Sequence, residues 1–226
     1  MLLCWRRLPD ALGTETIMND IVKPRWTRRK NARPKELLSA ALNAFVERGF
    51  AATKLEDVAR MAGVSKGTLY LYYESKEELF MAVVRETIVP NIAQAEKIMT
   101  EFKGDTRDLF KELIANWYRQ ISSVDMAGIC KLMFAEASNF PELAQFYHAE
   151  VIQRSESMMT QMLERGMKSG EFRELDLNVM PKIIIAPMVM LMLWNKSFCP
   201  FAQQPVSEED YIRAYIENTV QGLLKV

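Results

Sequence analysis

The residues best suited to specific recognition chemistry lie between positions 53 and 76, in the segment TKLEDVARMAGVSKGTLYLYYESK. Lys66 can donate hydrogen bonds to the O6 and N7 acceptors of guanine. Gly67 lets the backbone come close to a base, and Tyr70 follows Lys66 by one helical turn on a similar face. Together with Thr68, these residues are expected to reach the base edges and phosphates of double-stranded DNA from the start of a helix.

Hydroxyl and ammonium groups at nearby helix starts and edges are suited to bind DNA phosphates. The expected phosphate contacts are Thr53, Ser65, Tyr72 and Lys76. A helical hairpin with a merely solvated surface is the alternative, because an Ala-x3-Gly spacing is weak by itself. The combination of a small residue, a glycine turn, a hydroxyl cap, Lys-Gly-Thr and clustered tyrosines favours DNA binding.

Catalytic and metal chemistry find little support in the chain. His148 is the single histidine, and the motifs GxGxxG, GxxxxGK[ST] and HExxH do not occur. Cys4, Cys130 and Cys199 lie too far apart for a zinc site or a disulfide framework, which favours a reducing cytoplasm. We therefore expect no enzyme, no cofactor and no metal.

Short helices are expected to position the DNA-facing residues. After Pro34, apolar residues recur on one helical face from Leu37 to Val46, and Gly49 ends this helix. Three further helix starts are predicted, at the capping box Thr53–Glu56, at Ser65, and at the capping box Ser75–Glu78. The turn Ala62-Gly63-Val64 then joins two helices of about eight to ten residues into a helix-turn-helix.

The rest of the chain has helical periodicity and no convincing strand, which predicts an all-α fold. The expected helices are a long one at 76–99, followed by 105–122, 126–139, 142–168, 176–198 and 207–224. Asp105 and Ser207 are the expected caps, and Gly166 and Gly170 are expected to interrupt the pattern.

Composition excludes several classes of protein. The 226 residues are 49% hydrophobic and 26% charged, unlike a disordered chain. The longest apolar run, Ile183 to Trp194, spans twelve residues and contains Pro187, so it falls short of the roughly twenty that a bilayer requires. No membrane partner is therefore expected.

The net charge of zero is a balance between two halves of opposite sign. Residues 1–85 contain 15 Lys and Arg against 10 Asp and Glu, giving +5, whereas residues 86–226 contain 14 against 19, giving −5. A basic N-terminal half attracts DNA, and an acidic remainder helps to orient that half toward it.

This organisation predicts three regions. Residues 1–32 form a flexible basic tail, in which 1–17 are expected to be dispensable. Residues 33–80 form the helix-turn-helix domain, and residues 81–226 form a helical domain for effector binding and dimerisation.

The segment from about Pro34 to Phe80 resembles the N-terminal domain of tetracycline-repressor-like (TetR/AcrR) regulators. The likeness is strongest in Ala-Gly-Val-Ser-Lys-Gly-Thr-Leu-Tyr at 62–70, followed by Tyr72-Tyr73, Ser75-Lys76 and Leu79-Phe80. At Leu71-Tyr72, many family members carry a Tyr-His or Tyr-Tyr pair before an aromatic residue. This departure is expected to alter operator contacts without affecting the fold. The resemblance implies a homodimer with a three-helix DNA-binding domain, a small effector bound in the C-terminal domain, and a dimer interface formed by the last two helices.

Ten of the fifteen methionines fall between residues 126 and 192, where aromatic residues are interleaved. Most of them are expected to fill the core, but methionine also suits permissive apolar surfaces. Given the family, we expect a cavity for a small hydrophobic effector, bordered by Trp117, Met133, Phe134, Met162 and Met188. The expected dimer contacts are Ile184, Met188, Leu191, Ile212, Tyr215, Ile216, Thr219 and Leu223.

The sequence thus predicts a dimeric, ligand-responsive repressor that places its 65–72 helix in the major groove of a palindromic operator. Effector binding is expected to act through the long 76–99 helix. A ligand-independent structural DNA-binding protein and an enzyme with a vestigial helix-turn-helix are the alternatives.

Overall fold

The computed structural model describes residues 33–123, 126–204 and 206–225. The chain divides into two units, residues 1–30 and 31–226, and all described residues belong to the second. The predicted basic tail, residues 1–32, therefore lies outside the described residues. Within the described ranges the regular structure is helical, which confirms the all-α class, and the only β pairing there is an isolated bridge between Phe172 and Leu224.

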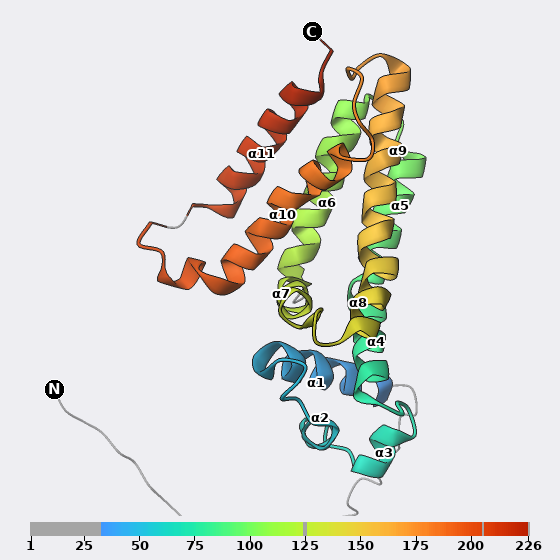
Figure 1. Cartoon of the computed structure of the whole chain (residues 1–226), viewed down its shortest axis with the longest axis vertical. Coiled ribbons are helices and arrows are strands. Elements are labelled where there is room, and N and C mark those ends of the chain that lie inside the picture. The colour runs from blue at the N-terminus through green and yellow to red at the C-terminus, as the bar shows by residue number, and fades with distance from the viewer. Residues whose placement is uncertain (1–32, 124–125, 205, 226) are drawn as a thin grey trace, which may run out of the picture. The chain divides into compact units, whose positions relative to one another are not determined.

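The helices follow one another with short connections (Figure 1). They are α1 (Arg33–Arg48), α2 (Leu55–Met61), α3 (Lys66–Tyr70), α4 (Lys76–Thr87), α5 (Val89–Glu101), α6 (Thr106–Ser123), α7 (Met126–Glu136), α8 (Pro141–Tyr147), α9 (Gln153–Ser169), α10 (Met180–Ser197) and α11 (Glu208–Leu223). A π-helical turn, η1 (His148–Ile152), joins α8 to α9, and a 3₁₀ turn, η2 (Cys199–Phe201), follows α10. We call α1–α4 the head and α5–α11 the body.

The head is built around three buried phenylalanine rings. Phe45, Phe50 and Phe80 contact one another with ring centroids 5.4–5.6 Å apart. Gly63 has φ 65° in the turn between α2 and α3, a left-handed conformation that glycine adopts without steric cost. This turn joins α2 to α3, as predicted for the helix-turn-helix, but both helices are shorter than the predicted eight to ten residues: α2 has seven residues and α3 has five.

Three of the predicted helix caps are present. Ser65 accepts a hydrogen bond from the Thr68 backbone N–H at 3.1 Å, Ser75 from Glu78 at 3.0 Å, and Ser207 from Asp210 at 3.2 Å. Each bond satisfies a backbone donor that the first helical turn leaves unpaired.

The predicted capping box at Thr53 is wrong. The residue before α2 is Lys54, whose side chain makes no capping bond. The Thr53 side chain is buried instead, and its hydroxyl donates to the carbonyls of Ala44 at 3.1 Å and Gly49 at 2.7 Å. Thr53 therefore closes the C-terminal end of α1 rather than opening α2.

The predicted helix 76–99 is two helices that meet at Ile88, the C-cap of α4 and the N-cap of α5. Pro90 lies in the first turn of α5, where its missing N–H costs nothing. The predicted helix 142–168 is likewise divided, because η1 inserts a π-helical turn between α8 and α9.

The sequence predicts that Gly166 interrupts a helix, but this residue lies inside α9. The ring of Phe172 packs directly on it, and a Cβ at this position would lie 2.1 Å from that ring. Gly170, with φ 79°, is the residue that ends α9. Gly166 therefore serves close packing, while Gly170 serves the left-handed turn.

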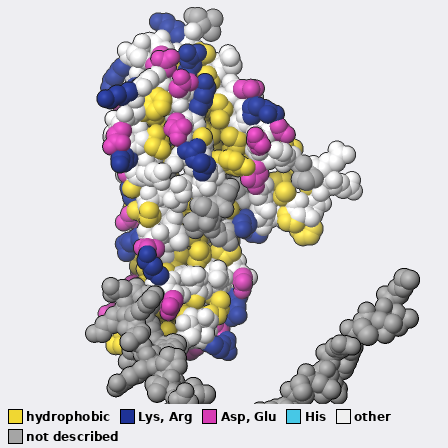
Figure 2. All heavy atoms as spheres, turned by 180° about the vertical axis from the view of Figure 1, so that it is seen from behind, with side chains coloured by type: hydrophobic (Ala, Val, Ile, Leu, Met, Phe, Trp, Pro, Cys, Tyr) yellow, Lys and Arg dark blue, Asp and Glu magenta, His cyan; other side chains and the backbone are white. Residues whose placement is uncertain are grey.

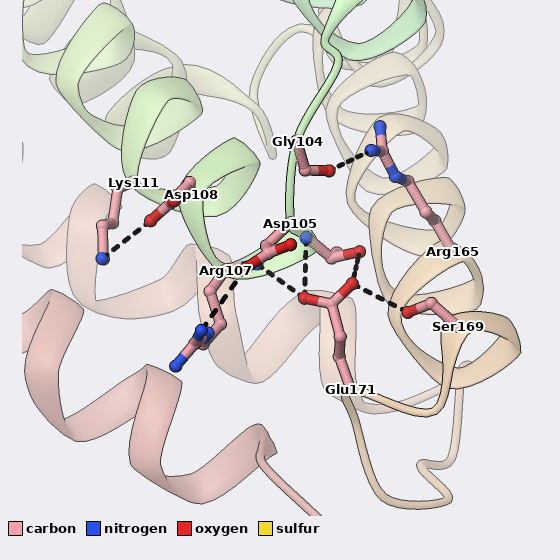
Figure 3. Close-up of polar contacts among 9 residues, drawn as sticks. Gly104, Asp105, Arg107, Asp108, Lys111, Arg165, Ser169 and Glu171 are labelled. Atoms are coloured by element: carbon pink, nitrogen blue, oxygen red, sulfur yellow. Dashed lines mark hydrogen bonds and ion pairs between the residues drawn. The ribbon is translucent and has the colours of Figure 1, made fainter.

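The start of α6 is capped by Glu171, from the connection after α9, and not by Asp105 (Figure 3). The Glu171 carboxylate accepts hydrogen bonds from the Thr106 N–H at 2.7 Å, the Thr106 hydroxyl at 2.8 Å and the Ser169 hydroxyl at 2.8 Å. Burial by itself raises the pKa of Glu171, but these hydrogen bonds outweigh it and the pKa is lowered. Asp105 pairs with Arg107 instead.

Candidate nucleic-acid interface

One surface of α3 is free to meet DNA. Lys66, Gly67 and Tyr70 are exposed, whereas Leu69 on the opposite side is fully buried in the head core. Because the buried Leu69 side chain packs α3 against the rest of the head, Lys66, Gly67 and Tyr70 stay on its exposed face. The structure therefore brings together the base-contacting residues that the sequence predicted, with Thr68 half-buried beside them.

Lys66 on α3 forms an ion pair with Glu56 on α2, which the sequence interpretation did not anticipate. The hydrogen bond from Lys66 lowers the pKa of Glu56, and the same bond raises the pKa of Lys66. The Lys66 ammonium also lies 5.7 Å from the centre of the Tyr70 ring. Glu56 was missed because the sequence interpretation treated it only as part of a helix cap.

Leu71, directly after α3, is part of the Leu71-Tyr72 pair at which the sequence departs from the family pattern. Its side chain is 83% exposed, which is unusual for leucine in a folded domain. Tyr72 beside it is exposed as well, and both residues directly follow the exposed residues of α3. An exposed leucine at this place suits apolar contact with a thymine methyl group.

Two predicted phosphate contacts have other partners in the head. The Lys76 ammonium donates to the carbonyls of Phe50 at 2.8 Å and Ala51 at 3.1 Å, and it lies 4.5 Å from the centre of the Phe50 ring. Thr53 is buried and bonded to the end of α1. Both residues hold the connection between α1 and α2, so we exclude them from the interface. Ser65 stays exposed while it caps α3.

The head itself carries little net charge. Residues 33–85 contain eight Lys and Arg against seven Asp and Glu, a balance of +1. Most of the +5 of residues 1–85 therefore comes from residues 1–32. The long-range attraction to DNA that the charge pattern predicts depends mainly on that N-terminal segment.

Besides the apolar core that the head shares with α7 and α8, aromatic and polar contacts join the head to the body. Phe50 packs edge-on against Phe140, which precedes α8, with ring centroids 4.6 Å apart. The Arg85 guanidinium lies 4.7 Å from the Phe146 ring and 4.0 Å from the Glu150 carboxylate. The Ala51 N–H donates to Glu136 at 3.4 Å. These contacts join the head to the segment around α8 and η1.

The five residues predicted to border an effector cavity do not share one wall. Met133 packs in the core that the head shares with α7 and α8, while Met162 and Met188 pack in the core of the body. Phe134 is 65% exposed, and Trp117 is half-buried. Helical periodicity shows which face of each helix is apolar, but it does not show which neighbouring helix that face packs against.

The predicted dimer contacts are mostly used within one subunit. Six of the eight are buried in the body: Ile184, Met188, Leu191, Ile212, Tyr215 and Leu223. The Tyr215 hydroxyl donates to the Ile184 carbonyl at 2.7 Å, which joins α11 to α10. Ile216 and Thr219 are half-buried.

A different row of apolar side chains is exposed along α10 and the turn after it. Its members are between 47% and 84% exposed: Ile183, Met190, Trp194, Phe198 and Phe201. Figure 2 shows hydrophobic side chains gathered at the projecting end where α10 runs into η2. The residues predicted for the dimer on α10 are therefore buried within the subunit, and the exposed apolar residues lie on a neighbouring face of the same helix.

Membrane and metal sites are not found in the part of the chain that the structure describes. No helix in the described ranges is long and apolar enough to span a bilayer. The same residues contain no group of three His, Cys, Asp or Glu side chains placed to hold a metal ion. Burial raises the pKa of the Cys130 thiol to about 11, so this group is inert as a nucleophile at neutral pH.

Two family models match the chain. Residues 37–83 match "Bacterial regulatory proteins, tetR family", and residues 102–207 match "Tetracyclin repressor-like, C-terminal domain". The HTH-type transcriptional regulator RutR of Escherichia coli O157:H7 is 47% identical, over 52% of this chain and 78% of its own. The fatty acid metabolism regulator protein of Bacillus subtilis is 26% identical, over 64% of this chain and 74% of its own.

The fold also matches solved structures. The transcriptional regulator FadR of Bacillus subtilis, in complex with stearoyl-CoA, superposes with a TM-score of 0.71 at 22% identity. That match covers 84% of this chain and 98% of FadR.

Proposed function

The chain belongs to the TetR family of bacterial regulatory proteins and is a transcriptional regulator, and from this premise we propose that it acts as a homodimeric repressor. Each subunit places α3 in the major groove of one half-site of a palindromic operator. The half-sites are separated by about one helical turn of DNA, 34–36 Å, or a small multiple of it. A small hydrophobic effector releases the dimer.

The observation that carries this proposal is the exposed row on α3. Lys66 donates to guanine, Gly67 allows close approach, and Tyr70 lies beside them, while buried Leu69 holds the helix in place. Ser65, Thr68 and Tyr72 contact phosphates, and Leu71 adds an apolar contact.

The residues outside α3 have separate roles in this proposal. Residues 33–80 read the operator, and the basic residues 1–32 supply phosphate contacts that strengthen binding without sequence preference. Residues 81–226 bind the effector and form the dimer. The acidic body repels DNA, so the head is the part that approaches it.

In the proposed dimer, a second copy of the chain covers the exposed apolar residues of α10. An isolated subunit would leave this row in water, which is unfavourable for a contiguous apolar surface. Two copies related by a two-fold axis bury the same residues against each other. This symmetry is also what requires a palindromic operator.

The names of two relatives favour an apolar effector. The fatty acid metabolism regulator protein and FadR, solved with stearoyl-CoA, are both associated with acyl groups. The stearoyl chain is apolar, and we propose that the effector of this chain is likewise hydrophobic but, unlike stearoyl-CoA, small.

A selection experiment tests the DNA part of the proposal. Full-length protein would be used to enrich duplexes from a random-sequence library, and the recovered motif would be sequenced. We expect an inverted repeat, to which Lys66→Ala binds roughly tenfold more weakly than the wild-type protein. Enrichment of no motif would contradict sequence-specific binding, and enrichment of a single half-site would contradict the symmetric dimer.

A further inference from the structure

A cavity of about 290 Å³ opens between α5 and α9, two helices that lie side by side in Figure 1. Its lining consists of Glu96, Met99, Thr100, Arg154, Ser157, Met158 and Gln161. This volume lies just below the range of about 300–1,000 Å³ that is typical of ligand pockets. None of the residues predicted from the sequence to border an effector cavity belongs to this lining.

Arg154 and Glu96 meet in the wall of this cavity. The Nε atom of Arg154 donates to one Glu96 oxygen at 3.0 Å, and Nη2 donates to the other at 2.7 Å. The hydrogen bond with Glu96 raises the pKa of Arg154, and burial acts in the opposite direction. The charge of the guanidinium is therefore balanced, but Nη1 has no partner among the residues that the structure describes.

The two hydroxyl groups of the lining are already bonded. The Thr100 hydroxyl donates to the Lys97 carbonyl at 2.9 Å, and the Ser157 hydroxyl accepts from Gln161 at 3.3 Å. Met99 and Met158 supply adaptable apolar surface and also pack against the core of the body. The Ser157 hydroxyl therefore keeps its own O–H free to donate, and the lining combines the two methionines with this neutral donor and the charged Nη1 of Arg154.

The electrostatics of the cavity disfavour an anionic ligand. Glu96 pairs with Arg154 at close range, and Glu150 also acts on the pKa of Arg154, so two carboxylates already surround the one guanidinium. A third carboxylate would have to displace Glu96 or be repelled by both. A neutral acceptor such as a carbonyl oxygen can bind Nη1 without disturbing the pair.

We propose that this cavity is the effector site and takes a small neutral molecule with an apolar body and one carbonyl group, such as a ketone, ester or amide. The carbonyl oxygen accepts from Nη1 of Arg154, and the apolar body lies against Met99 and Met158. The binding site is inferred from the cavity, and only its role as effector site rests on the proposed function.

The position of Arg154 connects the cavity with the head. Arg154 comes two residues after η1, and η1 contains Glu150, which pairs with Arg85 of α4. Phe146, one residue before the end of α8, lies under the same Arg85 guanidinium at 4.7 Å. A π-helical turn holds one residue more than an α-helical turn, so movement of Arg154 is absorbed by a change of register in η1. Such a change displaces Glu150 from Arg85.

Calorimetric titration of the full-length protein without DNA tests the site, with 2-octanone and octanoate as probes of equal chain length. We expect 2-octanone to bind the wild-type protein roughly tenfold more tightly than octanoate, and Arg154→Gln to weaken 2-octanone binding roughly tenfold. Lys168→Gln is the matched control, because Lys168 on the same helix pairs with exposed Glu164 at 3.5 Å, away from the cavity lining.

Glu96→Gln is the second variant, and it reverses the preference for the neutral probe. Without the Glu96 charge, the guanidinium is free to pair with a carboxylate, so octanoate should bind this variant several-fold more tightly than it binds the wild-type protein. Met158→Trp should fill the cavity and abolish binding of both probes. These variants keep the proposal testable if Arg154→Gln does not fold.

Three results would overturn the site. They are stronger binding of octanoate than of 2-octanone to the wild-type protein, unchanged 2-octanone binding in folded Arg154→Gln, and no binding of 2-octanone at all. DNA binding is measured separately. A protein that binds 2-octanone but no DNA would overturn the proposed function and leave the site, whereas one that binds DNA but no ketone would do the opposite.

Discussion

Lys66 on α3 is paired with Glu56 on the preceding helix, α2, so the cation that we propose to contact a base is engaged within the chain before DNA is present. Both side chains are exposed, and exposed ion pairs contribute little to stability. The pair therefore matters more for binding than for folding, because Lys66 must exchange a carboxylate for a base or a phosphate. In the proposed complex, Glu56 also places a negative charge beside the DNA backbone.

The first prediction concerns Glu56→Gln. We expect this variant to bind both operator and random DNA several-fold more tightly, because it removes a competing carboxylate and a repulsive charge. The logarithm of affinity should also fall more steeply with the logarithm of salt concentration, by about one unit of slope for one additional phosphate contact. Fluorescence anisotropy at several salt concentrations measures both quantities.

Lys66→Gln and the double variant complete this experiment. If Glu56 acts through Lys66, most of the gain from Glu56→Gln should disappear when Lys66 is absent. A gain of equal size in both backgrounds would show that Glu56 acts only by general repulsion of DNA. Weaker binding by Glu56→Gln would contradict the prediction altogether.

The second prediction concerns the reading row of α3. Lys66→Ala and Tyr70→Ala should each weaken operator binding, roughly tenfold for Lys66, since one good contact to a base pair contributes about 1–3 kcal/mol. Helicity and oligomeric state should not change, because both side chains are exposed. Lys97→Ala, an exposed lysine on α5 in the body, is the control. Unchanged affinity in both head variants would reject α3 as the reading helix.

The third prediction separates a structural lysine from a DNA-binding one. Lys76→Met should lower the free energy of unfolding by about 1–3 kcal/mol, because two carbonyls at the end of α1 lose a charged donor. The salt dependence of DNA binding should stay the same in the folded protein. Urea unfolding and anisotropy give the two values, and a smaller salt slope with unchanged stability would restore Lys76 as a phosphate contact.

Local signals predicted three of the helix starts, because the two partners of each capping bond lie within a few residues. Ser65, Ser75 and Ser207 each cap a donor three residues later, so the sequence alone reveals the bond. The Gly63 turn was predicted for the same reason.

Features that depend on distant partners could not be predicted in this way. Glu171 caps a helix that begins 65 residues earlier, and Thr53 turns inward because α1 ends beside it. The face of α10 that is free depends on where α7 and α11 pack. Periodicity locates an apolar stripe, but packing decides which stripe is covered.

The fourth prediction concerns the pH dependence of stability. Hydrogen bonds from Thr106 and Ser169 hold the pKa of Glu171 below its ordinary value despite burial. A group whose pKa is lowered by folding stabilises the native state above its unfolded pKa, and this contribution is lost as pH falls through the folded pKa. Glu171→Gln should therefore be less stable than the wild-type protein at pH 7, and the difference should shrink in acid.

Urea unfolding of both proteins from pH 7 to pH 3 checks this prediction. Glu174→Gln is the control, because Glu174 is exposed and its carboxylate is not part of this cap. A difference between wild type and Glu171→Gln that stays constant over the whole pH range would show that the carboxylate charge does not contribute.

The last prediction concerns the dimer and uses the exposed face of α10. Trp194→Glu and Met190→Glu should each dissociate the proposed dimer, because a carboxylate would be buried without a partner when two copies meet. Each isolated subunit should keep its helicity, since both residues are exposed in the single chain.

Ile152→Glu, at an exposed apolar residue of η1, is the matched control. Sedimentation velocity at micromolar concentration measures the mass. Dimers that persist in both α10 variants would place the interface elsewhere. Loss of the dimer together with loss of operator binding would support a mechanism in which two copies of α3 read the two half-sites at once.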